Sequence, residues 1–161
     1  MGWTDYFVLL GFIAVCVVAA SSGAVFQPGA WYKTLKKPWW NPPDWMFPVV
    51  WTVLYAFMAI AGWLVWRSAG SFGAAALPLT FFALQLVLNA LWSAIFFGLK
   101  RIDWALVEVA FLWAAILACI VTFAPFSATA AWLMAPYLLW VTIAAYLNYT
   151  VLKLNRQALA A

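Results

Sequence analysis

Residues 104–124 read WALVEVAFLWAAILACIVTFA, and this stretch decides the fold class. Apart from Glu108 and Thr122 it consists of aliphatic and aromatic residues and one cysteine. A helix that crosses a bilayer needs about 20 predominantly apolar residues. The stretch is long enough and apolar enough to span a membrane, so it predicts a transmembrane helix.

Four more stretches have the same character, and they cover residues 6–26, 47–66, 74–98 and 128–152. Of the 161 residues, 70% are hydrophobic and only 7% are charged, whereas a soluble domain is about half apolar and about a quarter charged. A domain of this size cannot bury the excess apolar surface, which must face lipid. We predict an all-α membrane protein with a single domain over residues 1–161, folded as one bundle of five transmembrane helices. Because Asp5 and no cation precedes the first span, we expect that span to be retained rather than cleaved.

The connections between the predicted spans are short after the first loop. Residues 67–73 and 100–103 predict antiparallel neighbouring helices in a bundle. Asp103 is expected to cap the N-terminus of the fourth helix, and Pro125 is expected to end that helix.

The cations indicate how the bundle is oriented. With five spans, the first loop, the third loop and the C-terminal tail lie on one side, and Arg67 lies on the other. Cytoplasmic loops are enriched in Lys and Arg, so we predict an outer N-terminus and a cytoplasmic C-terminus, while the choice between inner and outer bacterial membrane stays open. The cations on the predicted cytoplasmic side are Lys33, Lys36, Lys37, Lys100, Arg101, Lys153 and Arg156.

The composition also limits the chemistry. The chain has no histidine, four carboxylates and two cysteines, Cys16 and Cys119, both inside apolar stretches. A Ser-His-Asp triad and a His-based metal site are excluded, and buried cysteines of this kind behave as small apolar residues. We expect no catalytic residues, no metal and no covalently required cofactor. Because the cations flank spans rather than cover a soluble face, we expect no nucleic acid partner.

The first loop reads QPGAWYKTLKKPWWNPPDWM over residues 27–46. A flexible linker would be rich in Gly and Ser, whereas this loop is rich in Trp and in prolines that restrict the backbone. We predict that it folds onto the helix ends as a lid. The alternative is that its tryptophans belong to the aromatic belt at the membrane interface.

Three of the predicted helices carry faces that could form a pocket. On the third helix Gln85, Asn89 and Ser93 lie within one arc with Trp92 and Phe96. These polar groups could either bind ligand or form hydrogen bonds between helices. A stripe of aromatic and small residues marks the second helix and another marks the fifth, and the residues are Phe47, Trp51, Tyr55, Met58, Gly62, Pro136, Trp140, Ala144 and Leu147. Such stripes are more often packing than pocket, but flat aromatic walls with a few amides suit a planar hydrophobic ligand.

Two outward surfaces carry weaker signals. Ala90, Ala94 and Gly98 have the small-xxx-small spacing that lets helix backbones approach, and Ala110, Ala114 and Ala118 repeat it. The pattern serves either packing in the bundle or a homodimer. Near the C-terminus, three residues fit a proposed cholesterol pattern, although the preferred interpretation from the residues alone is an ordinary interfacial Tyr with a snorkelling Lys: Leu147, Tyr149 and Lys153.

The motifs together resemble the TspO/MBR family, which includes the bacterial tryptophan-rich sensory proteins and the mitochondrial translocator protein. In the first loop and second helix the matching residues are Trp31-Tyr32, Leu35, Lys37-Pro38, Trp40-Asn-Pro-Pro43, Phe47, Val50-Trp51 and Leu54-Tyr55. In the third helix they are Gln85-Leu86, Leu88-Asn89, Leu91-Trp92-Ser93 and Phe96-Phe97-Gly98, and in the fifth Pro136-Tyr137, Trp140 and Leu147-Asn148-Tyr149.

The resemblance implies a five-helix bundle, commonly a homodimer, that binds porphyrins such as protoporphyrin IX, haem, sterols and synthetic isoquinoline or benzodiazepine ligands. The sterol motif ends in Lys153 here, where the animal proteins have arginine. The implied pocket residues, with Tyr55 added from the aromatic face of the second helix, are Tyr32, Pro42, Trp51, Asn89, Trp92, Trp140 and Ala144.

Three hypotheses for function follow. The first is a membrane receptor or carrier for tetrapyrroles and similar hydrophobic ligands, with a role in transmembrane transport or in regulating pigment and stress responses. The second is a light-dependent porphyrin-degrading enzyme, which would need Trp51 and Trp140 near the bound ring. The third is a sterol- or lipid-binding scaffold that acts through its outer surface.

Overall fold

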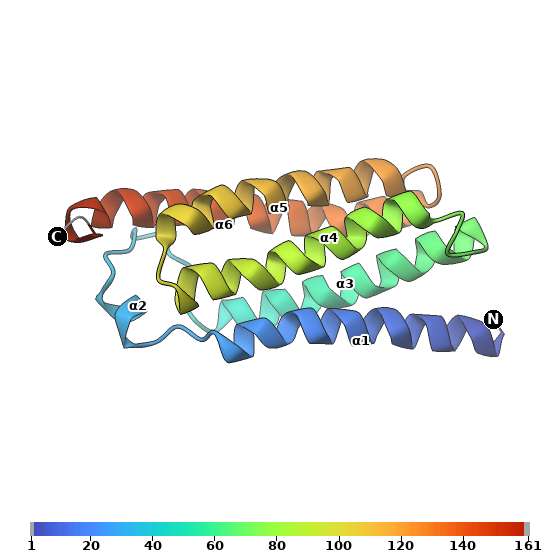
Figure 1. The fold of residues 1–161 in the computed structure, drawn as a ribbon, viewed down its shortest axis with the longest axis horizontal. Helices are drawn as coiled ribbons and strands as arrows, with labels where there is room; N and C mark the ends of the chain where they lie inside the picture. Colours follow the sequence, from blue (N-terminus) through green and yellow to red (C-terminus); the bar gives the residue numbers. More distant parts are fainter. Residues whose placement is uncertain (1, 160–161) are drawn as a thin grey trace.

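In a computed structural model of the chain, residues 2–159 are described, with side chains described as far as residue 156. They form a bundle of long helices that run side by side along one axis (Figure 1). The long helices are α1 (Trp3–Val25), α3 (Met46–Ala69), α4 (Ala76–Ser93), α5 (Ile102–Phe123) and α6 (Ala128–Leu159). A short helix, α2 (Ala30–Thr34), lies in the first loop, and a π-helical turn, η1 (Ala94–Gly98), extends α4.

Five helices are long and apolar enough to cross a membrane. They are α1, α3, α4 with η1, α5 and α6, with mean hydropathy between 1.6 and 2.4 over the apolar window. The five predicted spans are therefore confirmed, and the chain is an integral, multi-pass membrane protein. The predicted bounds differ from the observed helices by a few residues at most ends, and α6 continues well beyond residue 152.

Sequence chemistry accounts for where several helices end. α3 stops at Gly70, which adopts a left-handed φ of 78° and donates its N–H to the carbonyl of Trp66. The prediction that Asp103 caps the fourth spanning helix is wrong: α5 begins two residues earlier than that cap would give, at Ile102, with Arg101 as N-cap. The carboxylate of Asp103 instead accepts two hydrogen bonds from the guanidinium of Arg101, at 2.8 and 2.6 Å.

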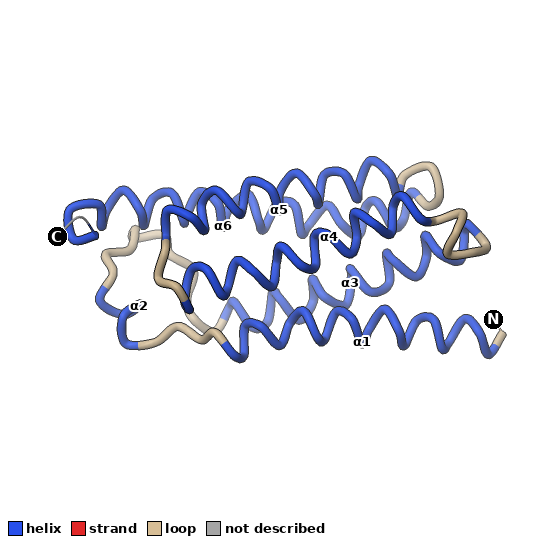
Figure 2. Tube along the Cα trace, in the orientation of Figure 1, coloured by secondary structure: helices blue, strands red, loops and turns tan. Residues whose placement is uncertain are grey.

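The two ends of the bundle differ in what they carry. The first loop, the link between η1 and α5 and the C-terminal end of α6 lie together at one end, and the N-terminus and the α3–α4 link lie at the other (Figures 1 and 2). The first group contains every Lys and Arg of the chain except Arg67. The cations therefore gather at one end of the bundle, as the sequence predicts.

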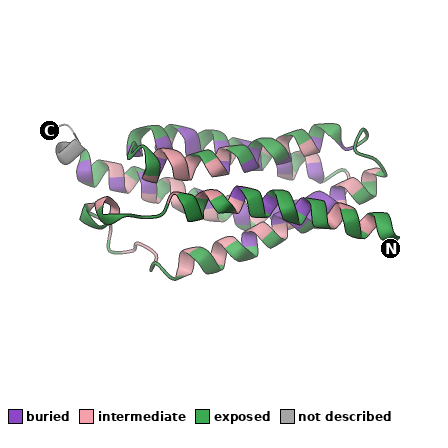
Figure 3. Ribbon diagram, turned by 60° about the horizontal axis from the view of Figure 1, so that its bottom comes forward, coloured by how far each residue is buried: buried purple, intermediate pink, exposed green. Residues whose placement is uncertain are grey.

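The interior is formed unequally by the five spans. Within the apolar window of each span, 39% of α3 and of α5 is buried, against 17% of α1. Exposed and buried residues alternate along the five long helices, and α1 presents a broad exposed face (Figure 3). In a membrane these exposed apolar side chains meet lipid rather than water. α1 therefore lies at the edge of the bundle, against α3 and α4.

Candidate functional site

A chain of hydrogen bonds in the bundle interior links α3, α4 and α6. The hydroxyl of Tyr55 donates to Oδ1 of Asn89 at 2.9 Å, and Nδ2 of Asn89 donates to the hydroxyl of Tyr137 at 2.6 Å. Tyr137 is fully buried and Asn89 is 6% exposed. A buried amide is stable only when its donors and acceptors are paired, so the two tyrosines explain why Asn89 can lie inside an apolar bundle.

Aromatic rings surround this chain between α3 and α6. Trp51 lies 5.6 Å from Tyr55 and 6.0 Å from Tyr137 between ring centroids, and Trp140 lies 5.9 Å from Phe47. The contact between Trp51 and Tyr137 and the contact between Phe47 and Trp140 are both edge-to-face, a geometry that aromatic pairs favour. We call these five rings, Phe47, Trp51, Tyr55, Tyr137 and Trp140, the aromatic cluster. It supplies flat apolar walls beside one buried amide.

The first loop packs on a separate group of rings at the charged end of the bundle. Tyr32 of α2 makes edge-to-face contacts with Phe96 and Phe97 of η1, at 6.1 and 5.4 Å. The ammonium of Lys37 lies 4.0 Å above the ring of Tyr32. Burial, together with the nearby carboxylate of Asp44, raises the pKa of the Tyr32 hydroxyl, so Tyr32 stays a neutral donor around neutral pH. The first loop is therefore folded onto the helix ends.

Two contacts fasten the loop to α6. The side chain of Asn155 accepts the N–H of Lys36 and donates to the carbonyl of Lys36, both at 2.9 Å. Further along the loop, the ring of Trp40 stacks on Tyr146 at 5.3 Å with 13° between the planes. Trp39, by contrast, is 96% exposed. The two adjacent tryptophans thus differ: one holds the loop against α6, and the other fits the interfacial belt.

The predicted pocket residues fall into two groups. Trp51, Tyr55, Asn89 and Trp140 meet in or beside the aromatic cluster. Trp92 instead stacks on Phe96 at 4.9 Å, next to the rings that Tyr32 touches, and its indole N–H donates to Asn148 at 3.3 Å. Pro42 and Ala144 are half-buried, in the loop and on α6 respectively. Tyr32 and Trp92 therefore both pack on Phe96 and Phe97 of η1, at the loop end of the bundle.

The residues that the sequence predicted for the outer surfaces differ in how far they are exposed. Tyr149 is half exposed and Lys153 is exposed on the outside of α6, whereas Leu147 packs inward. On α4 and η1, Ala90 and Ala94 are half-buried, and a Cβ added at Gly98 would lie 2.9 Å from the ring of Phe26. At Gly98 the small-residue pattern therefore admits an aromatic ring of the same chain.

Sequence reasoning missed two polar residues with structural consequences, Asn155 and Glu108, and it named a third, Gln85, without showing whether its amide is paired. Asn155 lies beyond the end of the predicted last span, so nothing in the sequence indicated that its side chain would bind the first loop. Gln85 is fully buried with neither amide atom paired, and Glu108 is 8% exposed with neither carboxyl oxygen paired, among the residues described. A carboxylate inside a predicted span is itself the signal for a functional residue.

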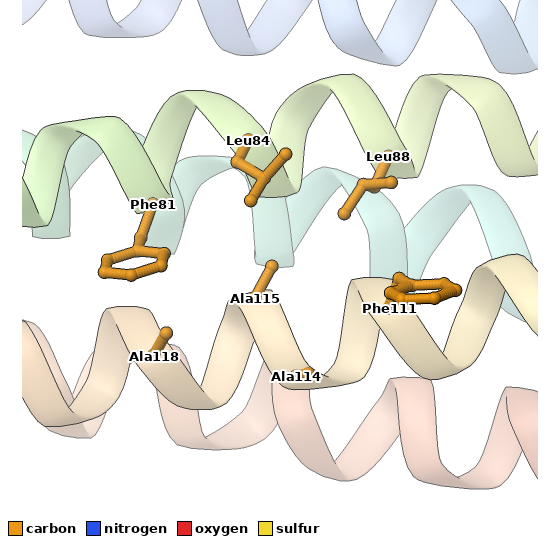
Figure 4. Close-up of a pocket in the computed structure, with 7 residues that line it drawn as sticks. All are labelled: Phe81, Leu84, Leu88, Phe111, Ala114, Ala115 and Ala118. Atoms are coloured by element: carbon orange, nitrogen blue, oxygen red, sulfur yellow. The ribbon is translucent and has the colours of Figure 1, made fainter.

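Two grooves on the outer surface lie away from the aromatic cluster. One, with a volume of about 310 Å³, runs between α4 and α5 (Figure 4). The other, of about 290 Å³, runs between α5 and α6 and is lined partly by Trp113 and Thr142, which share a hydrogen bond. In the described part of the chain, no group of three or more Cys, Asp or Glu side chains could hold a metal ion.

Comparison with known proteins agrees with the motifs. Residues 12–154 match the TspO/MBR family. The chain is 42% identical to a tryptophan-rich sensory protein of Cereibacter sphaeroides over 151 residues, which cover 94% of this chain and 93% of the relative. It is 41% identical to protein CrtK of Rhodobacter capsulatus over 144 residues (89% and 90%) and 37% identical to the human translocator protein over 150 residues (91% and 89%). From its five spans, its tryptophan-rich loop and these relatives, the chain belongs to the TspO/MBR family.

Proposed function

We propose that this protein is a membrane receptor or carrier that binds tetrapyrroles, such as protoporphyrin IX and haem, and similar planar hydrophobic ligands. One observation carries the proposal: the buried amide of Asn89 is hydrogen-bonded to Tyr55 and Tyr137, and Trp51 of the aromatic cluster packs against both tyrosines. Offset or edge-on contacts with tryptophan add about 0.5–1.5 kcal/mol beyond the area that they bury. Ligand sites of this kind are mostly apolar, with a small number of placed polar groups.

The rings of the cluster touch one another in the structure, so a flat ligand would enter by separating α3 from α6 or by lifting the loop. Tyr32, Pro42 and Trp92 would then border the ligand at the loop end, and Ala144 would lie one turn beyond Trp140 on α6. The names of the relatives describe sensory and translocator proteins, and we infer a role in transport or in regulating pigment and stress responses.

The test is quenching of tryptophan fluorescence by protoporphyrin IX in detergent. Trp51→Phe and Trp140→Phe should each weaken affinity severalfold without unfolding the bundle, because Phe keeps much of the volume. Trp132→Phe is the matched control, since Trp132 is on α6 but 77% exposed. If both cluster variants titrate like the parent protein, the ligand does not bind at the aromatic cluster.

A second proposal, light-dependent porphyrin breakdown, has one supporting observation. Trp51 contacts both Tyr55 and Tyr137, so oxidisable rings are adjacent where the porphyrin would bind. Protoporphyrin absorbance should then be followed with purified protein in the dark and in light. Loss of the Soret band with a defined product in light supports an enzyme, and unchanged absorbance supports a receptor.

The outer surface supports two further proposals. Exposed Tyr149 and Lys153, together with Leu147, are the candidate sterol or lipid site. If these residues form such a site, substitution of Tyr149 by Ser should abolish retention on sterol-coated resin.

We also propose a homodimer. Because Gly98 packs on Phe26 of the same chain, Ala94→Leu tests the dimer more sharply than a substitution of Gly98. We expect Ala94→Leu to weaken cross-linking in lipid and to leave porphyrin binding unchanged. A parent protein that does not cross-link would rule out the dimer.

A further inference from the structure

One exposed face of α6 joins an apolar groove to two cations. Thr142 and Ala145 line the groove between α5 and α6. Tyr149, Lys153 and Arg156 follow toward the C-terminal end of the helix, and all three are exposed. At 100° per residue, the five residues lie within an arc of about 80° around α6. A single strip therefore runs from the groove, past a hydroxyl, to the charged end of the bundle.

The groove is suited to a hydrocarbon chain. It has a volume of about 290 Å³, and its two polar side chains are paired with protein groups. The indole N–H of Trp113 donates to the hydroxyl of Thr142 at 2.9 Å, and that hydroxyl donates to the carbonyl of Leu138 at 2.8 Å. The remaining lining is aliphatic, so a bound chain gains burial but no hydrogen bond. The lining consists of Leu106, Val109, Ala110, Trp113, Thr142 and Ala145.

The two cations of the strip have no acidic partner among the side chains that the structure describes, where the ion pair found is that of Arg101 with Asp103. Asp103 is the exposed carboxylate nearest the groove along α5, three residues before Leu106. Both of its oxygens accept hydrogen bonds from Arg101, at 2.8 and 2.6 Å. The strip therefore keeps a net positive charge beside the membrane, which favours an anionic partner.

The structure separates this strip from the sterol pattern found in the sequence. Leu147 lies about 160° from Tyr149 around the helix and packs inward, with the buried group that includes Phe96 and Val151. A rigid sterol on the outer face of α6 would therefore contact Tyr149 and Lys153 but not Leu147. A lipid chain that reaches the groove instead contacts the strip on both sides of Tyr149.

We propose that this strip binds one anionic phospholipid, with an acyl chain in the groove between α5 and α6 and the phosphate beside Lys153 and Arg156. Ala145 precedes Lys153 by eight residues, about 12 Å along the axis, so the chain enters the groove after passing Tyr149. Lys153 and Arg156 are three residues apart and are neighbours on the helix surface, which lets both contact one phosphate. The proposal rests on the candidate sterol or lipid site of α6 and names its ligand class, and it does not depend on tetrapyrrole binding.

The test is native mass spectrometry of the protein released from a non-ionic detergent, which counts bound lipid molecules. The probes are dioleoylphosphatidylglycerol and dioleoylphosphatidylcholine, which share their acyl chains and differ in net charge. The parent protein should retain one molecule of the phosphatidylglycerol about tenfold more tightly. Lys153→Gln/Arg156→Gln should bring the two lipids to equal affinity. Lys33→Gln/Lys100→Gln, which removes two exposed cations from the same end of the bundle, should keep the preference.

A second pair of variants tests the groove. Ala110→Phe fills it from an exposed position and should weaken the binding of both lipids. Ala114→Phe changes an exposed alanine of the same helix that lines the groove between α4 and α5, and it should bind both lipids like the parent. Equal affinity of the parent for the two lipids would overturn the proposal. So would a preference that survives in Lys153→Gln/Arg156→Gln or falls equally in Lys33→Gln/Lys100→Gln, or unchanged lipid binding by Ala110→Phe.

Retention on sterol-coated resin separates this proposal from the one on which it rests. If the resin retains the parent protein while the two phospholipids bind equally, α6 carries a sterol site and the anionic phospholipid is ruled out. A preference for phosphatidylglycerol without retention on the resin supports the phospholipid and rules out the sterol.

Discussion

Asn89 is held from both sides, by Tyr55 on α3 and Tyr137 on α6. If only its place on α4 is considered, Asn89→Leu is expected to change ligand preference more than stability. The hydrogen bonds lead to a different prediction. Leucine would leave the hydroxyl of fully buried Tyr137 unpaired, and an unpaired buried group costs about 1–3 kcal/mol. We expect a clearly lowered melting temperature in detergent.

The double variant Asn89→Leu/Tyr137→Phe distinguishes a lost hydrogen bond from a poor fit of leucine. It removes Asn89 together with its fully buried partner, so the part of the loss that comes from the unpaired Tyr137 hydroxyl should return, while half-buried Tyr55 lacks its acceptor in both variants. Should the double variant melt no higher than Asn89→Leu, the loss of stability comes from packing of the leucine and not from the unpaired hydroxyl.

At Gly62 of α3, the ring of Phe12 from α1 packs directly against the glycine. A Cβ at this residue would lie 2.7 Å from Cε1 of Phe12 and 3.2 Å from Cζ of Phe82. Both rings are buried, so Gly62→Ala should overpack the interior and destabilise the protein by about 1–3 kcal/mol. Gly11→Ala on α1 meets no atom within 4 Å and should melt like the parent, and equal melting temperatures for the two variants would contradict the packing.

At the scale of elements, a few side-chain contacts hold the first loop in place against α6. Trp40→Ala removes the ring stacked on Tyr146, a contact worth about 0.5–1.5 kcal/mol beyond its buried area. Hydrogen exchange of loop amides in residues 30–46 should become about fivefold faster, as about 1 kcal/mol implies. Exposed Trp39 is the adjacent control, and Trp39→Ala should leave exchange unchanged. Similar acceleration in both variants would show that stacking on Tyr146 does not hold the loop.

The five long helices could be predicted because apolar length is a local property of the sequence. The short helix α2, the turn η1 and the capping residue of α5 could not, because they depend on where the chain meets other elements. The clearest example is Asn155, which binds Lys36 across 119 positions of sequence. In the candidate site, helical spacing placed Trp51 and Tyr55 on one face and Asn89 inward, but it gave no indication that Tyr137 joins them. It did place Trp92 in the same arc as Phe96 of η1, on which Trp92 stacks.

At the scale of the whole molecule, the charged end of the bundle predicts a topology. We expect Lys33→Cys and Arg156→Cys to react with a membrane-impermeant maleimide from the same side, the cytoplasm, and Arg67→Cys to react from the other. Both native cysteines are buried and should give little background. Labelling of residues 33 and 156 from opposite sides of the membrane would contradict the five-span arrangement.

The turn η1 has a consequence for how this family member tolerates change in length. A π-helical turn holds one residue more than an α-helical turn, and such turns occur mostly as single-turn bulges inside α-helices. It acts as a one-residue insertion that rotates the following residues about the helix axis. In this chain it follows the buried amides of α4 and comes immediately before the link to α5, where Phe96 and Phe97 both reach Tyr32. A single-residue deletion within 94–98 would therefore reset the loop-facing rings and leave the membrane-embedded register of Gln85 and Asn89 as it is.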